Sequence, residues 1–188
     1  MIFGGQKTQG PRLSDLKVTG TEYGQPIQYC LGHPRVAGQL VYASQKYEIA
    51  DTQTAGKGGG QQYTSYTYDV DLLYLLSDDE LQGVSRIWLN GELIWTLVGD
   101  DTDPQATMAN IISSLKSERW QRMTFYPGSA DQLPDPDYEA AVPNAPAYRG
   151  RATIFFKRLK LGSSGQLPQL TFEIFDNGRI PGGYLYAP

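Results

Sequence analysis

The chain of 188 residues contains one cysteine, Cys30, and one histidine, His33. A disulfide needs two cysteines and zinc needs three or four protein ligands, so neither a disulfide nor a zinc site is expected. The C-x-x-H spacing of these two residues also lacks a third group that would orient a catalytic base. We therefore expect no metal, no cofactor and no thiol chemistry.

Charged residues are also scarce, at 19% of the chain, and the formal net charge is −4. Without a basic field to neutralise phosphates, sequence-specific binding of nucleic acid is not expected. No window of the sequence approaches the ~18 consecutive apolar residues of a membrane-spanning helix. We therefore expect no membrane span.

Glycine, proline and tyrosine are abundant, with 21, 12 and 13 residues. Such a composition favours strands and turns over a helical bundle. A period of two over residues 63–76 predicts a long strand that becomes buried on both sides toward its C-terminal end. The side chains on one face of this strand are Tyr66, Tyr68, Val70, Leu72, Tyr74 and Leu76.

A glycine-rich segment, Asp51–Gln62, precedes that strand, and residues 38–44 before it also read as a strand. The segment contains four glycines and no apolar side chain except Ala55, so we expect a flexible loop at the tip of a hairpin. Lys57 is its only cation. A phosphate-binding loop is rejected because Gly58 stands where such a loop needs serine or threonine.

The dipeptide Asn90-Gly91 is typical of a two-residue β-hairpin turn. The simplest register pairs Leu89 with Glu92, Trp88 with Leu93, Ile87 with Ile94 and Arg86 with Trp95. Trp88, Leu93 and Trp95 would then share one face, and Ile87, Leu89 and Ile94 the other. Because both faces are apolar, we expect this hairpin to lie between layers or to offer one face to a partner.

The other elements complete a mainly β (α+β) prediction, an antiparallel β-barrel-like or sandwich-like domain with one or two helices. A helix is expected from Asp103 to about Ser117–Arg119, and residues 127–150 read as irregular. Further strands are expected at 123–126, 151–159 and 169–175.

Two carboxylate pairs leave an enzymatic alternative open. Asp69 and Asp71 project from one side of a strand, as a glycosidase-like pair would, and Asp135 and Asp137 form a second candidate. A solvated strand face and turns explain these residues more simply, so we expect no catalytic residue and no enzyme. Carbohydrate stacking on Trp88, Trp95 or the tyrosine stripe stays open as a second alternative.

A series of short strings occurs in order from Gly10 to Phe175. The strings are GPRLSDLKV (10–18), TEYGQPI (21–27), RVAG (35–38), GVSRIW and NGELI (83–94), YPG (126–128), DQLPDP (131–136), PAYRG (146–150) and LPQLTFE (167–173). Together they resemble a family of phage tail proteins that includes the baseplate hub and tail-tip proteins of siphophages and of gene transfer agents.

The resemblance implies a structural virion protein at the distal end of the tail, made in the bacterial host cytoplasm. It implies a homo-oligomeric ring, a trimer or a hexamer, that closes or extends the tail tube and contacts other tube or baseplate proteins. The alternative is a receptor-binding or carbohydrate-binding module of the tail. The residues expected at the partner interface are Trp88, Leu93, Trp95, Lys57, Tyr66 and Tyr68.

The same reading divides the chain into three parts. Residues 1–12 are expected to form a flexible N-terminal arm, 13–176 a hub-like β domain with its hairpin tip at 51–62, and 177–188 a C-terminal tail. Family members are usually far longer, so we expect either a compact free-standing version or the N-terminal piece of a larger hub.

Overall fold

The computed structural model describes residues 7–9, 26–54, 61–96, 118–176, 179–180 and 184–185. These residues form β-strands and one short helix. The strands are β1 (Lys7–Gln9), β2 (Arg35–Ala37), β3 (Gln39–Ala43), β4 (Tyr47–Thr54), β5 (Gln62–Ser77), β6 (Gly83–Leu89), β7 (Glu92–Thr96), β8 (Arg122–Tyr126), β9 (Ala152–Gly162), β10 (Leu170–Phe175), β11 (Arg179–Ile180) and β12 (Tyr184–Leu185), and the helix is α2 (Pro136–Ala141).

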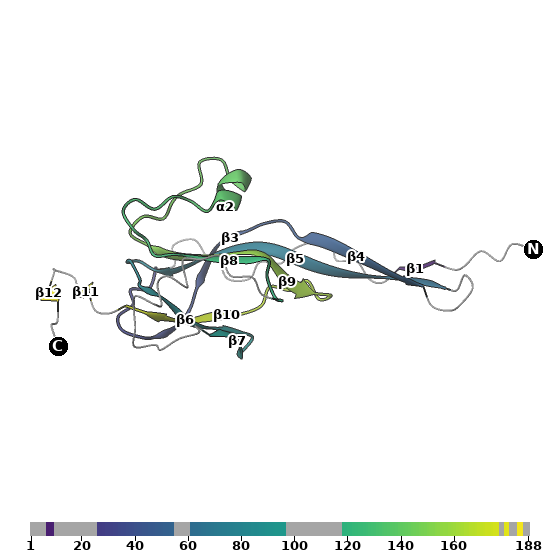
Figure 1. Cartoon of the computed structure of the whole chain (residues 1–188), viewed down its shortest axis with the longest axis horizontal. Helices are drawn as coiled ribbons and strands as arrows, with labels where there is room; N and C mark the ends of the chain where they lie inside the picture. The colour runs from purple at the N-terminus through teal and green to yellow at the C-terminus, as the bar shows by residue number, and fades with distance from the viewer. Residues whose placement is uncertain are drawn as a thin grey trace, which may run out of the picture.

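Two sheets build the body of the molecule (Figure 1). In the larger sheet β5 is central: β3 and β4 pair with one of its edges, β9 and the parallel strand β1 pair with the other, and β8 lies outside β9. The smaller sheet has the order β2-β10-β6-β7, and β11 pairs with β12 separately. The described strands form two packed sheets and do not close into a barrel. The prediction of a mainly β, sandwich-like fold is therefore confirmed.

The main core lies between the two sheets. Leu72 and Phe156 of the larger sheet and Ile87 and Phe172 of the smaller one are fully buried there. A second, smaller core on the outer side of the larger sheet joins Leu73 and Phe155 to Tyr138 of α2. Figure 1 accordingly shows three layers: the smaller sheet, the larger sheet, and the segment that carries α2.

Strand β5 belongs to both the exposed and the buried part of the larger sheet, and the burial of its side chains changes along its length. Its N-terminal residues alternate between exposed and covered, and from Tyr68 to Ser77 every residue is buried. A strand that lies between two apolar layers reads as a continuous hydrophobic run, whereas a strand with one wet face alternates. The predicted long strand with burial on both sides near its end is therefore confirmed.

Helix α2 lies within the segment 127–150 that was expected to be irregular, and that expectation is wrong for Pro136–Ala141. Asp135 caps the helix: its Oδ1 accepts hydrogen bonds from the backbone N–H groups of Asp137 and Tyr138, at 2.9 and 3.4 Å. Proline at the first helical position already has the required φ. The dipeptide Asp135-Pro136 is thus a sequence pattern typical of the beginning of a helix.

The glycine-rich tip is shorter than predicted. The ladder between β4 and β5 continues to the pair of Thr54 with Gln62, so residues 51–54 are strand and not loop. They have no apolar face of their own and are held by pairing with β5. The expected helix at 103–117 and the tip residues 55–60 lie outside the described residues.

Both chain ends contribute short strands where only a flexible arm and a tail were expected. Lys7–Gln9 forms β1, which pairs in parallel with Gln62–Thr64, and β11 and β12 lie within 177–188. In the part of the chain described here, no helix has the length and apolar character needed to cross a membrane.

Candidate assembly surfaces

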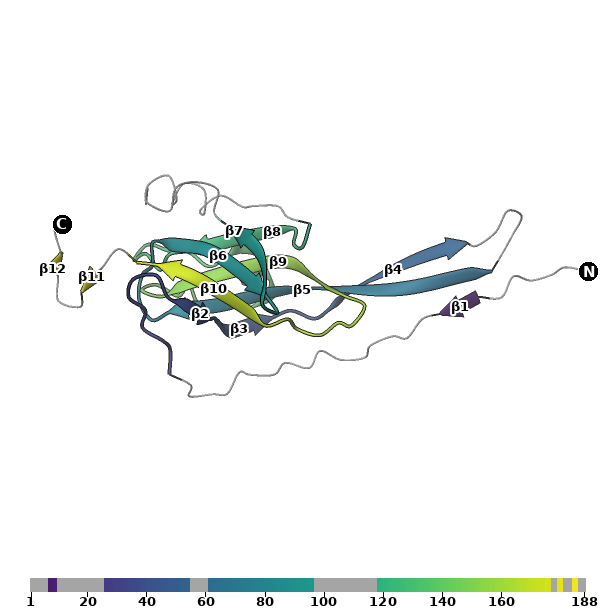
Figure 2. The same cartoon turned by 90° about the horizontal axis from the view of Figure 1, so that it is seen from below.

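The most prominent surface feature is a ribbon formed by β4 and the N-terminal half of β5, which we call the arm (residues 47–54 and 62–69). Figures 1 and 2 show it projecting well beyond the two-sheet body. All eight residues of β4 are exposed. Among the described residues only the three-residue strand β1, at Gln62–Thr64, and the end of β9, at Tyr68 and Asp69, pair with this ribbon besides its own two strands. Because a two-stranded ribbon is marginal in water, the arm is a surface that gains from packing against something else.

One face of the arm bears a row of exposed apolar side chains. Tyr47, Ile49 and Tyr63 are 37%, 44% and 50% exposed, and the β4–β5 register together with strand alternation places all three on the same face. This row was not predicted, because the tyrosines expected at the partner interface, Tyr66 and Tyr68, lie on the opposite face of the strand. The odd-numbered phase of the same alternation would have identified Tyr63.

The outer edge of β4 is a second assembly feature. Among the described strands, β4 pairs only with β5, and its sequence YEIADTQT contains neither proline nor lysine. Proteins normally protect a strand edge of this length with such residues, because unpaired backbone groups recruit further strands. The edge is therefore a candidate site for pairing with another chain.

The tyrosines predicted as partner contacts lie on the other face of the arm and are covered. Tyr66 is 9% exposed and Tyr68 is 2% exposed, and the ammonium of Lys46 lies 5.7 Å from the ring centroid of Tyr68. Both side chains are thus buried against the chain itself. Lys57, the third expected contact in this region, lies outside the described residues.

The β6–β7 hairpin turns at Asn90-Gly91 as predicted, but its register is not the predicted one beyond the second pair. Trp88 pairs with Leu93, and then a bulge makes Trp95, and not Ile94, the partner of Ile87. One extra residue in a strand reverses the direction of the side chains beyond it. Trp95 consequently packs against the main core, so the predicted shared face of Trp88, Leu93 and Trp95 is wrong for Trp95.

The outer face of the smaller sheet is polar and aromatic. The guanidinium of Arg35 lies 3.9 Å from the ring centroid of Trp88 and donates two hydrogen bonds to Thr171 Oγ1. Leu93, the cross-strand neighbour of Trp88, is 49% exposed. Arg35 covers one face of the Trp88 ring, which leaves less of it for a sugar to stack on.

Asp69 and Asp71 do lie on one face of β5, as the spacing predicts. Both oxygens of Asp71 are already engaged, because Oδ2 accepts a hydrogen bond from Tyr47 Oη and Oδ1 accepts one from the backbone N–H of Arg158. Burial is the main cause that raises the pKa of Asp69, against the lowering effect of the nearby Arg158. The contacts of Asp71 therefore hold β4 and β9 together.

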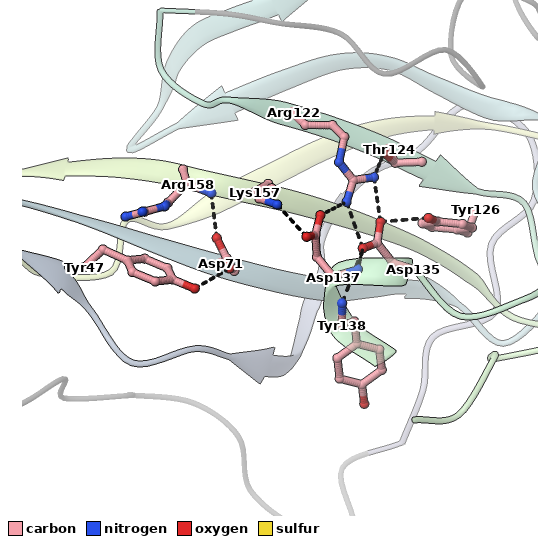
Figure 3. A network of polar contacts seen from close by, with 10 residues as sticks. All are labelled: Tyr47, Asp71, Arg122, Thr124, Tyr126, Asp135, Asp137, Tyr138, Lys157 and Arg158. Carbon is pink, nitrogen blue, oxygen red and sulfur yellow. Dashed lines mark hydrogen bonds and ion pairs between the residues drawn. The ribbon is translucent and has the colours of Figure 1, made fainter. Parts of the chain in front are cut away.

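Asp135 and Asp137 form an ion-pair network with Arg122 (Figure 3). The guanidinium contacts Asp135 at 2.8 Å and Asp137 at 2.6 Å, and Tyr126 Oη donates to Asp135 at 2.7 Å. Burial opposes ionisation of Asp137, but hydrogen bonds from Lys157 and Arg122 outweigh it and lower its pKa. Burial, followed by Asp135, raises the pKa of Tyr126. The network fastens the α2 layer to β8 and β9.

Cys30 and His33 do not come together with further ligands. Cys30 is 5% exposed, and burial raises the pKa of its thiol, which disfavours the reactive thiolate. The His33 ring stacks on Phe175 at 5.9 Å. Within the described residues no group of three or more histidine, cysteine, aspartate or glutamate side chains is placed to hold a metal ion.

Comparison with known proteins gives one informative result. No family model matches the chain, and no curated protein matches it either. A chain in the solved structure of the virion of a native gene transfer agent particle is similar, with 26% sequence identity and a TM-score of 0.54. The likeness covers 91% of this chain but only 31% of that chain.

That likeness supports a structural protein of a phage or gene-transfer-agent particle. It extends over both sheets, because it includes nearly the whole of this chain. The similar protein is more than three times as long as the matched region, so its other parts have no counterpart in the residues seen here.

Proposed function

We propose that this chain is a hub subunit of the tail tip or baseplate of a phage-like particle. It assembles into a homo-oligomeric ring, a trimer or a hexamer, which closes or extends the tail tube and attaches distal tail components. It also contacts neighbouring tube or baseplate proteins. After synthesis in the bacterial cytoplasm, the protein resides in the virion at the distal end of the tail.

The arm is the observation that carries this proposal. The two-sheet body encloses a core of its own. It also projects a ribbon whose β4 edge pairs with no further described strand and whose row Tyr47, Ile49 and Tyr63 is exposed. The solved structure that resembles it is itself part of an assembled virion. An arm that reaches the next copy makes a head-to-tail contact, and such contacts generate rings when the rotation closes.

The outer face of the smaller sheet is the second proposed contact surface. Trp88 and Leu93 are its apolar members. Lys57, which lies outside the described residues, is retained as a proposed partner contact. Trp95, Tyr66 and Tyr68 support these two surfaces from inside the chain. Aromatic residues beside arginine are typical of the well-packed centre of protein interfaces, which suits a neighbouring tail protein.

A non-enzymatic role is consistent with the described carboxylates. Of the four carboxylates proposed for a hydrolase, three have structural contacts: Asp71 holds β4 and β9, and Asp135 and Asp137 hold α2. The carbohydrate-binding alternative depended on open tryptophan faces, and Arg35 covers one face of Trp88 while Trp95 packs against the core. Glycan binding by the isolated chain that is lost in Trp88→Ala would favour this alternative over the hub.

The arm is tested by charging its apolar row. In the double variant Ile49→Lys with Tyr63→Lys, incorporation into particles should fall at least about tenfold, because an unpaired charge buried in an interface costs well over 1.4 kcal/mol. Both side chains are about half exposed in the free chain, so the variant should remain folded by circular dichroism. Immunoblotting of purified particles measures incorporation.

A matched control is available in the α2 layer. Leu133 is 69% exposed and lies away from the arm, so Leu133→Lys should be incorporated at the wild-type level. Normal incorporation of the folded double variant would overturn the assembly role of the arm. Native mass spectrometry of the wild-type chain, showing a monomer that never forms rings with its tail partners, would overturn the ring.

The smaller-sheet surface leads to a separate prediction. Leu93→Ser should leave the fold intact and reduce incorporation about fivefold, since burying the exposed half of a leucine contributes roughly 1 kcal/mol. Leu133→Ser provides the same chemical change at a site outside the proposed surface. Equal incorporation of the two serine variants would show that Leu93 makes no contact in the particle.

A further inference from the structure

The junction between the arm and the body contains a compact set of contacts centred on Asp71. This residue lies on β5 where the strand passes from the exposed arm into the buried body, and it is 7% exposed. Beyond this point toward the tip, none of the β4 side chains is buried. The direction of the arm therefore depends on what holds its base.

Asp71 connects three separate segments at that base, and Figure 3 shows its contacts with two of them, through Tyr47 and Arg158. Its Oδ2 accepts a hydrogen bond of 2.9 Å from Tyr47 Oη at the start of β4, and its Oδ1 accepts one of 2.7 Å from the N–H of Arg158 on β9. Its backbone exchanges two more bonds with Ser44, in the connection between β3 and β4. Ser44 N–H donates to Asp71 O, and Asp71 N–H donates to Ser44 Oγ, both at 2.9 Å.

The contact with Arg158 explains an irregularity of β9. Val70 pairs with Leu159 and Leu72 with Phe156, so Asp71 alone faces two residues of β9. Within this bulge Arg158 has φ of +55°, a left-handed conformation that is uncommon for a residue with a side chain. The carboxylate of Asp71 satisfies the N–H group that the bulge removes from the regular ladder.

The side chain of Arg158 also contacts the arm directly, at Tyr47. Its guanidinium lies 3.6 Å from the ring centroid of Tyr47, so the Tyr47 side chain is held at its hydroxyl by Asp71 and at its ring by Arg158. Burial and the hydrogen bond with Asp71 raise the pKa of Tyr47, which keeps its hydroxyl in the protonated, donating form. The three side chains thus lock β4 to β5 and to β9.

We propose that Asp71 is a positioning residue that sets the direction of the arm relative to the body, acting through Tyr47 and the bulge at Arg158. Loss of these contacts leaves the two-sheet body folded and frees the arm to change its direction. The consequence for particle assembly rests on the proposed hub function, whereas the effect on the arm is a property of the free chain. We call Asp71, Tyr47 and Arg158 together the clasp.

Hydrogen exchange of the free chain tests the clasp. In Tyr47→Phe, which removes one hydroxyl, and in Asp71→Asn, the β4 amides should exchange about tenfold faster, because local opening of a segment with few buried contacts no longer requires breaking its anchor. Peptides from residues 152–156 should keep wild-type protection. Asp51→Asn makes the same chemical change on the exposed arm, away from the clasp, and should leave the exchange of β4 unchanged.

Spin labels at Thr54→Cys and Glu139→Cys, in a Cys30→Ser background, report direction independently of stability. The distance distribution between arm and body should be narrow in the parent and broader in Tyr47→Phe. Unchanged exchange and an unchanged distribution in Tyr47→Phe would overturn the clasp. An equal acceleration of exchange in β4 and in residues 152–156 would also overturn the clasp, because it would show that the substitution destabilises the whole domain.

Assembly measurements separate this inference from the hub function. If Tyr47→Phe frees the arm and particles still incorporate the chain normally, the clasp stands and assembly does not depend on the direction of the arm; the double variant Ile49→Lys with Tyr63→Lys then decides whether the arm contacts a neighbour. If the arm is not freed, the clasp fails whatever the particles show. Loss of incorporation together with a released arm supports both.

Discussion

Replacing Arg122 with methionine should lower the free energy of unfolding by about 3 kcal/mol, because it leaves a buried carboxylate without its counter-ion. The side chain of Asp135 is only 1% exposed, and Arg122 contacts it through both terminal nitrogens. We expect the lower end of the usual range because Tyr126 and the helix N–H groups still donate to Asp135. Urea unfolding followed by tryptophan fluorescence measures the loss.

A second substitution distinguishes loss of charge pairing from loss of packing. Asparagine is a good helix N-cap and carries no charge, so adding Asp135→Asn to Arg122→Met should restore a large part of the lost stability. A double variant as unstable as the sum of the two single variants would contradict this explanation. The destabilisation would then come from packing against the Phe155 ring, which lies 5.3 Å from the guanidinium.

Gly128→Ala should be similarly damaging, with a loss of about 2–5 kcal/mol. Gly128 has φ of +96°, and a left-handed backbone costs an ordinary residue about 1–2 kcal/mol. A Cβ atom there would also lie 2.7 Å from the backbone nitrogen of Arg151. Because backbone cannot move aside as a side chain does, the overlap should add about 1–3 kcal/mol.

Gly150 is the matched control for this prediction. It has φ of +72°, and nothing lies within 4 Å of the position of its Cβ. Gly150→Ala should therefore cost only the conformational term, about 1–2 kcal/mol. Equal losses in the two alanine variants, measured by urea unfolding, would show that the close approach to Arg151 does not matter.

Local pattern was sufficient where one interaction dominates the choice of structure. The alternation in residues 63–76 and the Asn90-Gly91 turn predicted strands that the structure contains, and the strand expected at 169–175 is present as β10. In the strands the spacing of apolar residues matches the two-residue period of a strand with a buried face. In the turn, Asn90 and Gly91 adopt the positive φ that a two-residue hairpin requires. Such signals are local, so they need no knowledge of the partner strand.

The predictions failed where pairing with a segment distant in the sequence determines the local conformation. The bulge that turns Trp95 toward the core lies in a hairpin whose strand β6 pairs with β7 on one side and with β10 on the other. Residues 51–54 have the composition of a loop and are strand because β5 supplies the ladder. Neither outcome can be read from a hairpin considered alone.

The sequence by itself determined a mainly β protein with a long strand at residues 63–76 that is buried on both sides toward its C-terminal end, and its short strings resembled those of phage tail proteins. Only the tertiary structure decided which tyrosines face outward, since the phase of burial depends on what covers each face of β5. It also placed Asp71 at the base of the arm, where Tyr47 and Arg158 meet it. Those three residues lie up to 111 positions apart in the numbering (158 minus 47), and long-range pairing of strands brings them together.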